Sequence, residues 1–258
     1  MKTRGQLADI GKQLYSACKN GDIEEVQQLL QKNTPNNNIN WRDIYGATPL
    51  VIASQEGHTE IVKLLLNDPR IDVNEPTNYG QTAFWIACSK GSIETVKVLL
   101  NDPRVDVNQA TYHQTPFYMV CSNAFIEIVK LLSNVQRIDV NFPNDSGRTP
   151  LFYACQRGFT EVVEYILASG KEIDLHTKDS EGMSALDLGR YIHGRLAESD
   201  KSKRNYSKII ELLESFDRNP NETRFNLRMQ LGFSRKKNNL LLLIICLFLF
   251  AYFISFQF

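Results

Sequence analysis

Cysteine is the residue type in this chain whose spacing most suggests chemistry. Four of its five cysteines, Cys18, Cys88, Cys121 and Cys155, fall on one repeated position, which Ser54 occupies once. Thiols brought together could form disulfides or bind zinc. Equivalent positions on stacked helices lie about 8–10 Å apart, whereas a disulfide requires Cα atoms within about 7 Å. We therefore expect neither, and interpret the cysteines as small buried residues that pack inner helices in a reducing compartment.

The remaining reactive side chains form no catalytic pattern. The four histidines are scattered, and the sequence contains no Gly-x-x-x-x-Gly-Lys-Ser/Thr, His-Glu-x-x-His, Gly-x-Ser-x-Gly or Cys-x-x-Cys motif. The acidic residues follow repeated positions, which favours loop capping and solvated helix faces over acid–base catalysis. We therefore predict that the chain is not an enzyme and that it uses no metal, cofactor or small-molecule substrate. An enzymatic role requires its terminal segments to complete a site in another chain.

These positions belong to an internal repeat with a period of 33 to 35 residues. One repeated phrase is Thr-Pro-Leu or a close variant, at residues 48–50, 82–84, 115–117, 149–151 and, weakly, 184–186. Another is Asp-Val-Asn, at residues 72–74, 106–108 and 139–141, with Asp-Leu-His at 174–176 as a degraded copy. A glycine followed by an apolar stretch, such as Gly57 to Leu66, lies between the two phrases.

Each repeat predicts two short helices and a projecting loop. Thr48 before Pro49 is typical of a helix N-cap with proline at the first helical position. This helix should end near Gly57, where a positive φ is easily adopted, and a second, apolar-faced helix should begin at about Thr59. Leu64, Leu65 and Leu99 should then lie between units. One unit cannot bury its own apolar face, so the copies must stack into a solenoid.

The Thr-Pro-Leu phrase and the period resemble those of the ankyrin repeat, and in particular the large ankyrin families of unicellular eukaryotes. The resemblance implies an all-α solenoid of about six helix-turn-helix units over residues 7–216. The signature histidine is replaced throughout, and the fourth unit has His113 and Ala124 where glycine is usual, so this unit should be the least regular. The stretch from Arg195 to Asn205 is an insertion, expected to form a loop or a helical extension. The replacements of the signature histidine are Val51, Trp85, Tyr118, Phe152 and Asp187.

Arrays of this kind bind partners with loop tips and exposed inner-helix positions. A row of tyrosines at the tips, with polar neighbours, has the composition of a protein-binding surface. The alternative is that the tyrosine rings stack on one another and only stiffen the loops. The predicted partner-binding residues are Tyr45, Gln55, Glu56, Tyr79, Gln81, Ser89, Lys90, Tyr112, Gln114, Ser122, Asn123, Arg148, Gln156 and Arg157, and Ala47 is expected to be exposed beside them.

The C-terminal segment differs in composition from the repeats. Residues 217–239 are expected to form a capping helix, with Phe225, Leu227, Met229 and Leu231 over the open end, and then a basic linker. Residues 240–258 carry no charge, and 14 of these 19 residues are Leu, Ile or Phe, which predicts an apolar helix and a transmembrane tail anchor. The membrane flank Arg235-Lys236-Lys237 favours a cytosolic location for the repeats. No apolar stretch near the N-terminus suggests a cleaved secretory signal.

The sequence thus predicts non-catalytic protein recognition, or a scaffold, at the cytosolic face of a membrane. The partners expected are another protein and, through the tail, the membrane. Lys plus Arg and Asp plus Glu number 29 each, so no nucleic-acid partner is indicated. The alternative is a soluble regulator or inhibitor whose hydrophobic tail does not span a membrane.

Overall fold

The structure is a computed structural model that describes residues 4–32 and 38–233. These residues form thirteen α-helices and no β-strand. In chain order the helices are α1 (Arg4–Asn20), α2 (Ile23–Gln31), α3 (Pro49–Glu56), α4 (Thr59–Leu66), α5 (Ala83–Lys90), α6 (Ile93–Asn101), α7 (Pro116–Ser122), α8 (Ile126–Ser133), α9 (Pro150–Gln156), α10 (Thr160–Ala168), α11 (Ala185–Arg195), α12 (Lys203–Arg218) and α13 (Pro220–Gln230).

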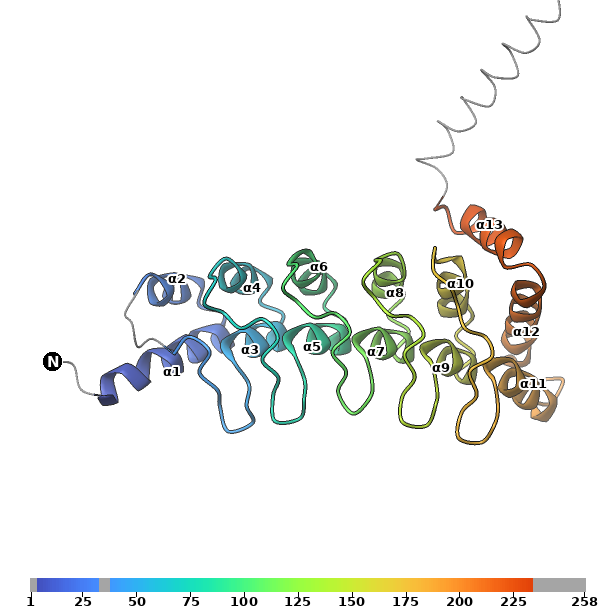
Figure 1. The fold of residues 1–258 in the computed structure, drawn as a ribbon, viewed down its shortest axis with the longest axis horizontal. Coiled ribbons are helices and arrows are strands. Elements are labelled where there is room, and N and C mark those ends of the chain that lie inside the picture. The colour runs from blue at the N-terminus through green and yellow to red at the C-terminus, as the bar shows by residue number, and fades with distance from the viewer. Residues whose placement is uncertain (1–3, 33–37, 234–258) are drawn as a thin grey trace, which may run out of the picture.

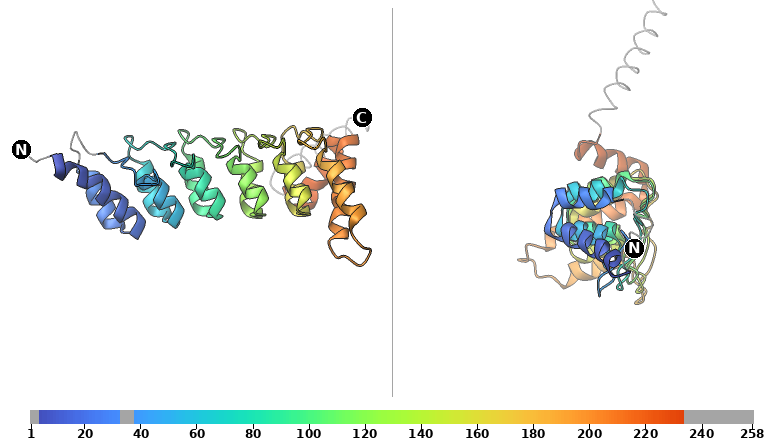
Figure 2. Two further views of the ribbon diagram at one scale, coloured as in Figure 1. Left: turned by 90° about the horizontal axis from the view of Figure 1, so that it is seen from below. Right: turned by 90° about the vertical axis from the view of Figure 1, so that its left-hand side faces the viewer.

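The helices stand in two rows, which confirms the predicted solenoid. The inner row is α1, α3, α5, α7, α9 and α11, each packed against the next, and the outer row is α2, α4, α6, α8 and α10 (Figure 1). Long loops project from the inner row, and Figure 2 shows them along one edge of the molecule. Helices α11 and α12 form the sixth unit, and α13 packs against α10 and α12 at the end of the array.

The repeated phrases form the helix ends that the sequence predicts. The side chain of Thr48 accepts a hydrogen bond from the backbone N–H of Val51 at 3.2 Å and caps α3. The helix ends at Gly57, whose φ of 75° lies in the left-handed region. The same threonine cap recurs on α5, α7 and α9, at Thr82, Thr115 and Thr149.

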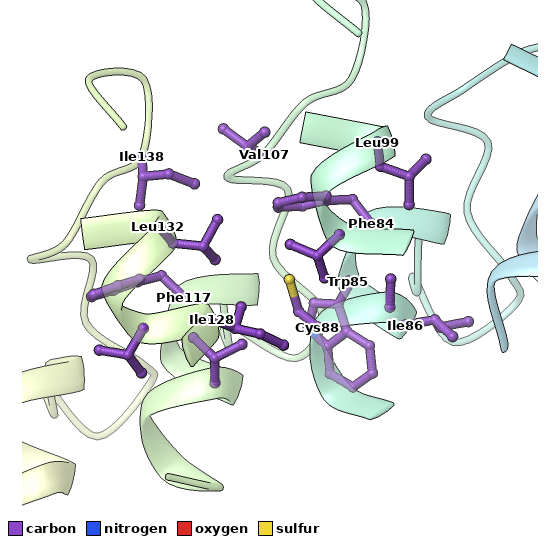
Figure 3. Packing of buried hydrophobic residues seen from close by; sticks show 14 of the residues in the cluster. Phe84, Trp85, Ile86, Cys88, Leu99, Val107, Phe117, Ile128, Leu132 and Ile138 are labelled. Carbon is purple, nitrogen blue, oxygen red and sulfur yellow. The ribbon is translucent and has the colours of Figure 1, made fainter. Parts of the chain in front are cut away.

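The third residue of each Thr-Pro-Leu phrase enters a continuous core between the rows. Figure 3 shows the rings of Phe84 and Phe117 in one cluster with Leu99, Leu132 and Ile138. Leu65 and Leu99 are buried as predicted, whereas Leu64 is half-buried. Stacking of the units removes apolar surface from water, and a single unit would leave much of that surface exposed.

The four cysteines at the repeated position lie inside this core and away from solvent. Cys18, Cys88, Cys121 and Cys155 are buried free thiols. Burial raises the pKa of the Cys18 thiol to about 12, and it raises the pKa of the other three thiols as well. They are therefore neutral packing residues at neutral pH, as the sequence predicts.

The fourth unit is the least regular, as expected. Three non-glycine residues have a positive φ in the described chain, and all belong to this unit: Tyr112 at 48°, His113 at 58° and Ala124 at 52°. The corresponding glycines elsewhere, such as Gly57 and Gly91, adopt this conformation without a Cβ clash. The fourth unit therefore stores backbone strain that its neighbours avoid.

The inserted stretch in the sixth unit is divided between both expected forms. Helix α11 extends to Arg195, and α12 begins at Lys203, which leaves residues 196–202 as a loop. Helix α13 differs from expectation. Leu227 is buried and Leu231 is half-buried, but Phe225 and Met229 are exposed and do not cover the end of the array. The basic flank Arg235-Lys236-Lys237 and the apolar tail at 240–258 lie outside the described residues.

The strain in the fourth unit can be measured directly. Replacing Ala124 with Gly removes the Cβ at a φ of 52° and should stabilise the protein by about 0.5–1 kcal/mol. The reverse change Gly57→Ala should destabilise it by about 1 kcal/mol, because alanine is strained at a φ of 75°; the new Cβ adds no clash, since its only close neighbour is Ser92 Oγ at 3.9 Å. Urea unfolding of both variants gives the free energies. A destabilised Ala124→Gly variant would show that the backbone there is not strained.

Candidate protein-binding surface

The loops that carry the candidate surface are joined by one repeated side-chain contact. Asn74 ends an Asp-Val-Asn phrase, and its side-chain amide donates to the carbonyl oxygen of Arg104 at 2.8 Å. Its Oδ1 accepts from the backbone N–H of Asp106 at 2.7 Å. One amide side chain thereby satisfies a donor and an acceptor of the next unit, as a backbone strand would.

The same pair of bonds occurs at four successive junctions. We call this set the Asn ladder; its members are Asn40, Asn74, Asn108 and Asn141. Each ladder residue after the first also donates its own backbone N–H to the aspartate two residues earlier, as Asn74 does to Asp72 at 3.1 Å. The aspartate fixes the turn, and the asparagine then binds the next unit.

A second repeated contact joins the outer row. Arg104 Nη2 donates to the carbonyl oxygen of Leu66, in the last turn of α4, at 2.6 Å. The Oδ2 of Asp102 lies 2.6 Å from Nη2 of Arg104 and holds the guanidinium in place. The hydrogen bonds from Arg104 lower the pKa of the Asp102 carboxyl. In the same way, the Nη2 of Arg70 donates to the carbonyl oxygen of Leu30, and the Asp68 carboxylate forms an ion pair with Arg70. A cation at a helix C-terminus satisfies free carbonyl groups and the helix dipole.

The loop tips are rigid and bonded to one another. In the first loop, the carboxylate of Asp43 accepts from the backbone N–H groups of Tyr45 and Ala47 at 2.9 and 2.8 Å. The backbone N–H of Asn78, in the next loop, donates to the carbonyl oxygen of Tyr45 at 2.9 Å. The first two tips therefore keep a fixed spacing, which reduces the entropy lost when a partner binds.

The predicted tyrosines are exposed on these tips. Tyr45, Tyr79 and Tyr112 are 56, 50 and 70 % exposed. Ring pairs in the described chain join other aromatics, such as Tyr118 and Tyr153, and none joins two of the three tip tyrosines. Stacking within the row therefore does not explain their position.

Sequence reasoning missed one residue of this row. Ile44 is 84 % exposed beside Tyr45, the highest exposure among the large apolar side chains of the described chain. The sequence feature that could have identified Ile44 is an apolar residue at a loop position that the repeat does not require to be buried. Together Ile44, Tyr45, Tyr79 and Tyr112 form what we call the tip row.

The predicted inner-helix residues lie in a second line. Gln55 and Glu56 end α3, which is eight residues or about 12 Å long, and the tip row precedes its first turn. The two lines are therefore separated by one inner helix. Three of the predicted residues are less available: the hydroxyl groups of Ser89 and Ser122 donate to carbonyl oxygens of their own helices, and Gln156 is half-buried. The exposed members form what we call the helix-end row, which consists of Gln55, Glu56, Lys90, Asn123 and Arg157.

The remaining predicted residues are engaged within the protein. Gln81 and Gln114 are half-buried, and the carbonyl oxygen of Gln114 accepts from the indole N–H of Trp85 at 2.8 Å. Ala47, which was expected to be exposed, is buried, because the loop folds back so that its backbone N–H reaches Asp43. These positions support the surface from beneath.

Arg148, which is also a predicted partner-binding residue, links two units. Its Nε lies 3.1 Å from Asp179 Oδ2, and its Nη2 lies 3.2 Å from Glu181. Burial alone would raise the pKa of Asp179, but hydrogen bonds from the Met183 and Glu181 N–H groups and from Arg148 outweigh it and lower that pKa. The pair therefore stays ionised and holds the loops of the fifth and sixth units together.

Other kinds of site were sought in the same residues. Within residues 4–32 and 38–233, no three His, Cys, Asp or Glu side chains gather as metal ligands. The helices of this part of the chain are also too short or too polar for one of them to cross a bilayer.

Comparison with known proteins gives a family match. A family model described as ankyrin repeats (3 copies) matches residues 14–111 and 102–179. BTB/POZ domain-containing protein 3 of Schizosaccharomyces pombe (strain 972) is 44 % identical over 57 residues, which are 22 % of this chain and 10 % of that protein. The match therefore spans about a tenth of that relative's length.

Solved structures with the same arrangement cover most of the chain. The crystal structure of an ankyrin repeat protein has a TM-score of 0.68 at 25 % identity and covers 79 % of this chain and 97 % of its own. A chain from the complex of a predatory endopeptidase of Bdellovibrio bacteriovorus with an immunity protein has a TM-score of 0.57 at 25 % identity. That match covers 76 % of this chain and 97 % of the other.

The Asn ladder is testable by mutation. Asn74→Ala leaves the Arg104 carbonyl and the Asp106 N–H without their protein partner, and should destabilise the fold by about 1–3 kcal/mol. Asn101→Ala is the control, since Asn101 is exposed at the end of α6 and its side chain makes no hydrogen bond within the described chain. It should change stability by less than about 0.5 kcal/mol. Equal free energies of unfolding for the two variants would show that the ladder is not stabilising.

Proposed function

Because the chain belongs to the ankyrin repeat family, we propose that it is a non-catalytic recognition module or scaffold that binds another protein. The observation that carries this proposal is the tip row. Four apolar or aromatic side chains stand exposed on loops that are fixed by backbone and side-chain hydrogen bonds. Exposed aromatic side chains on a pre-organised backbone are typical of binding hot spots.

The chemistry of the two rows indicates the kind of contact. The tip row supplies rings with an apolar body and a hydroxyl group, and the helix-end row supplies amides and single charges of both signs. Protein surfaces are recognised by this combination of an aromatic anchor and a polar rim. One similar chain comes from a complex between an endopeptidase and an immunity protein, which supports protein binding for this chain without identifying its partner.

The fold favours recognition over catalysis. Ankyrin repeats are typically non-catalytic, and here the four thiols of the described residues are buried, and acidic side chains such as Asp68 and Asp102 pair with arginines. The surviving enzymatic hypothesis, a site completed in another chain, predicts that purified protein hydrolyses a nucleotide, ester or peptide. Absence of any turnover in such assays would support the recognition module.

A membrane location is the second part of the proposal. The uncharged residues 240–258 would form a helix of roughly 28 Å, close to the hydrocarbon thickness of about 30 Å. The flank Arg235-Lys236-Lys237 would stay with the repeats on the cytosolic side. The alternative remains a soluble ankyrin regulator whose tail does not enter a bilayer.

The tip row predicts a specific loss of binding. The triple change Tyr45, Tyr79 and Tyr112 to Ser should weaken partner binding more than about 100-fold, since truncating one hot-spot aromatic costs about 2 kcal/mol or more. Partners are first identified by proximity labelling, and affinity is then measured by titration. Tyr191→Ser is the control, because Tyr191 is 53 % exposed on α11, outside the row. Unchanged affinity with an unchanged circular dichroism spectrum would refute the tip row as the binding surface.

The proposed tail anchor predicts that the protein fractionates with membranes. Full-length protein should stay with the membrane pellet after carbonate extraction, whereas a chain ending at Asn239 should be soluble, because the apolar run supplies the insertion energy. Proximity labelling with the same pair reports the location and the partners together. Release of the full-length protein at high pH would reject the anchor and favour the soluble regulator.

A further inference from the structure

Helix α13 directs two arginines toward the array and two large apolar side chains outward, which is the reverse of the usual arrangement in an amphipathic helix. Its arginines face the array: Arg224 Nη2 donates to the carbonyl oxygen of Lys171 at 2.7 Å, and Arg228 Nη1 donates to that of Ala168, at the end of α10, at 2.9 Å. These bonds repeat the contact that Arg104 makes with α4. The end of the array is thus completed by these two guanidinium groups together with Leu227, which is buried, and Leu231 and Phe233, which pack against the core.

The outward side of α13 carries the large apolar residues instead. Phe225 is 58 % exposed and Met229 is 51 % exposed. They lie four residues apart, so they share one side of the helix. Their exposed neighbours within α13 at helical spacings of three or four residues are Asn221, Glu222 and Asn226, and of these only Glu222 is charged.

The same helix determines where the chain leaves the folded part. The ring of Phe233 packs edge-on against Tyr165 of α10, with centroids 5.8 Å apart, and Arg228 lies over the Phe233 ring. In Figure 1, α13 lies at the level of the outer row, whereas the loop tips project on the other side of the inner row. The exit point is therefore on the side of the molecule that faces away from the tip row.

The length of chain beyond Phe233 limits how far away a bilayer can be. Arg235 is two residues further on, so the two Cα atoms are at most about 7 Å apart. The uncharged run begins at Asn238, five residues on, at most about 18 Å away. Basic residues beside an inserted helix favour the headgroup region, so insertion of residues 240–258 would hold α13 within this distance of the membrane surface.

We propose that the Phe225–Met229 side of α13 docks on the bilayer that holds the tail. This inference rests on the proposed membrane anchor. Two apolar side chains bind a membrane weakly on their own, but the tail keeps them beside it at a high effective concentration. Since α13 lies on the side of the array opposite the loop tips (Figure 1), docking through α13 would leave the tip row directed toward partners in the cytosol.

The test places a fluorophore on this side of α13. Full-length Phe225→Trp and Tyr79→Trp proteins are reconstituted into phosphatidylcholine vesicles with and without brominated acyl chains, and the wild type gives the background of Trp41 and Trp85. Both substitutions are at exposed side chains. Brominated lipid should lower the added emission of Phe225→Trp about twofold or more, and should leave the added emission of Tyr79→Trp unchanged.

Vesicle flotation of the same samples separates this inference from the anchor. If the protein floats with the vesicles and Phe225→Trp is not quenched, the anchor stands and the docking of α13 is wrong. Equal quenching of both tryptophans would also contradict it, since the tip row would then face the lipid. If the protein does not float, the anchor and the docking are both rejected, because the bilayer is the proposed binding surface.

Discussion

The hydrogen bonds of the Asn ladder determine how the units of this solenoid are aligned. The segments that lead into the loops contain turns and form no sheet, so their backbone groups lack the partners that a strand would have. Each ladder asparagine supplies one donor and one acceptor to the next unit, as Asn108 does for the Arg137 carbonyl and the Asp139 N–H. The apolar core holds neighbouring helices together without direction, whereas these bonds fix the position of one loop relative to the next.

The end of the array follows from the same constraint. At the position where a fifth ladder residue would stand, the chain has His176, which keeps the turn bond to Asp174 and lies 3.3 Å from Asp217 of α12. In the described part of the chain, α12 and α13 pack where the helices of a further unit would lie. Arg224 and Arg228 then supply to the last carbonyl groups what the arginine of another unit would have supplied. The inward arginines leave Phe225 on the outer side.

The fold could be predicted from the sequence, whereas the contacts that some residues make could not. Thr48, Pro49 and Gly57 act locally, so their helix ends could be predicted from neighbouring residues alone. The Asp-Val-Asn phrase was visible, but the contacts of its asparagine join residues about 30 positions apart and appear only after stacking. The exposure of Phe225 and the burial of Ala47 likewise depend on packing against other elements.

The most direct measurement is amide hydrogen exchange at the four N–H groups that the Asn ladder accepts, those of Asp72, Asp106, Asp139 and Asp174. They lie in loops, outside every helix, so helical hydrogen bonding cannot protect them. If the ladder aligns the units, all four should exchange as slowly as amides within the inner helices, because they open only when a junction between units opens. Exchange of these amides at the rate of an unstructured peptide, with the helices still protected, would contradict the account.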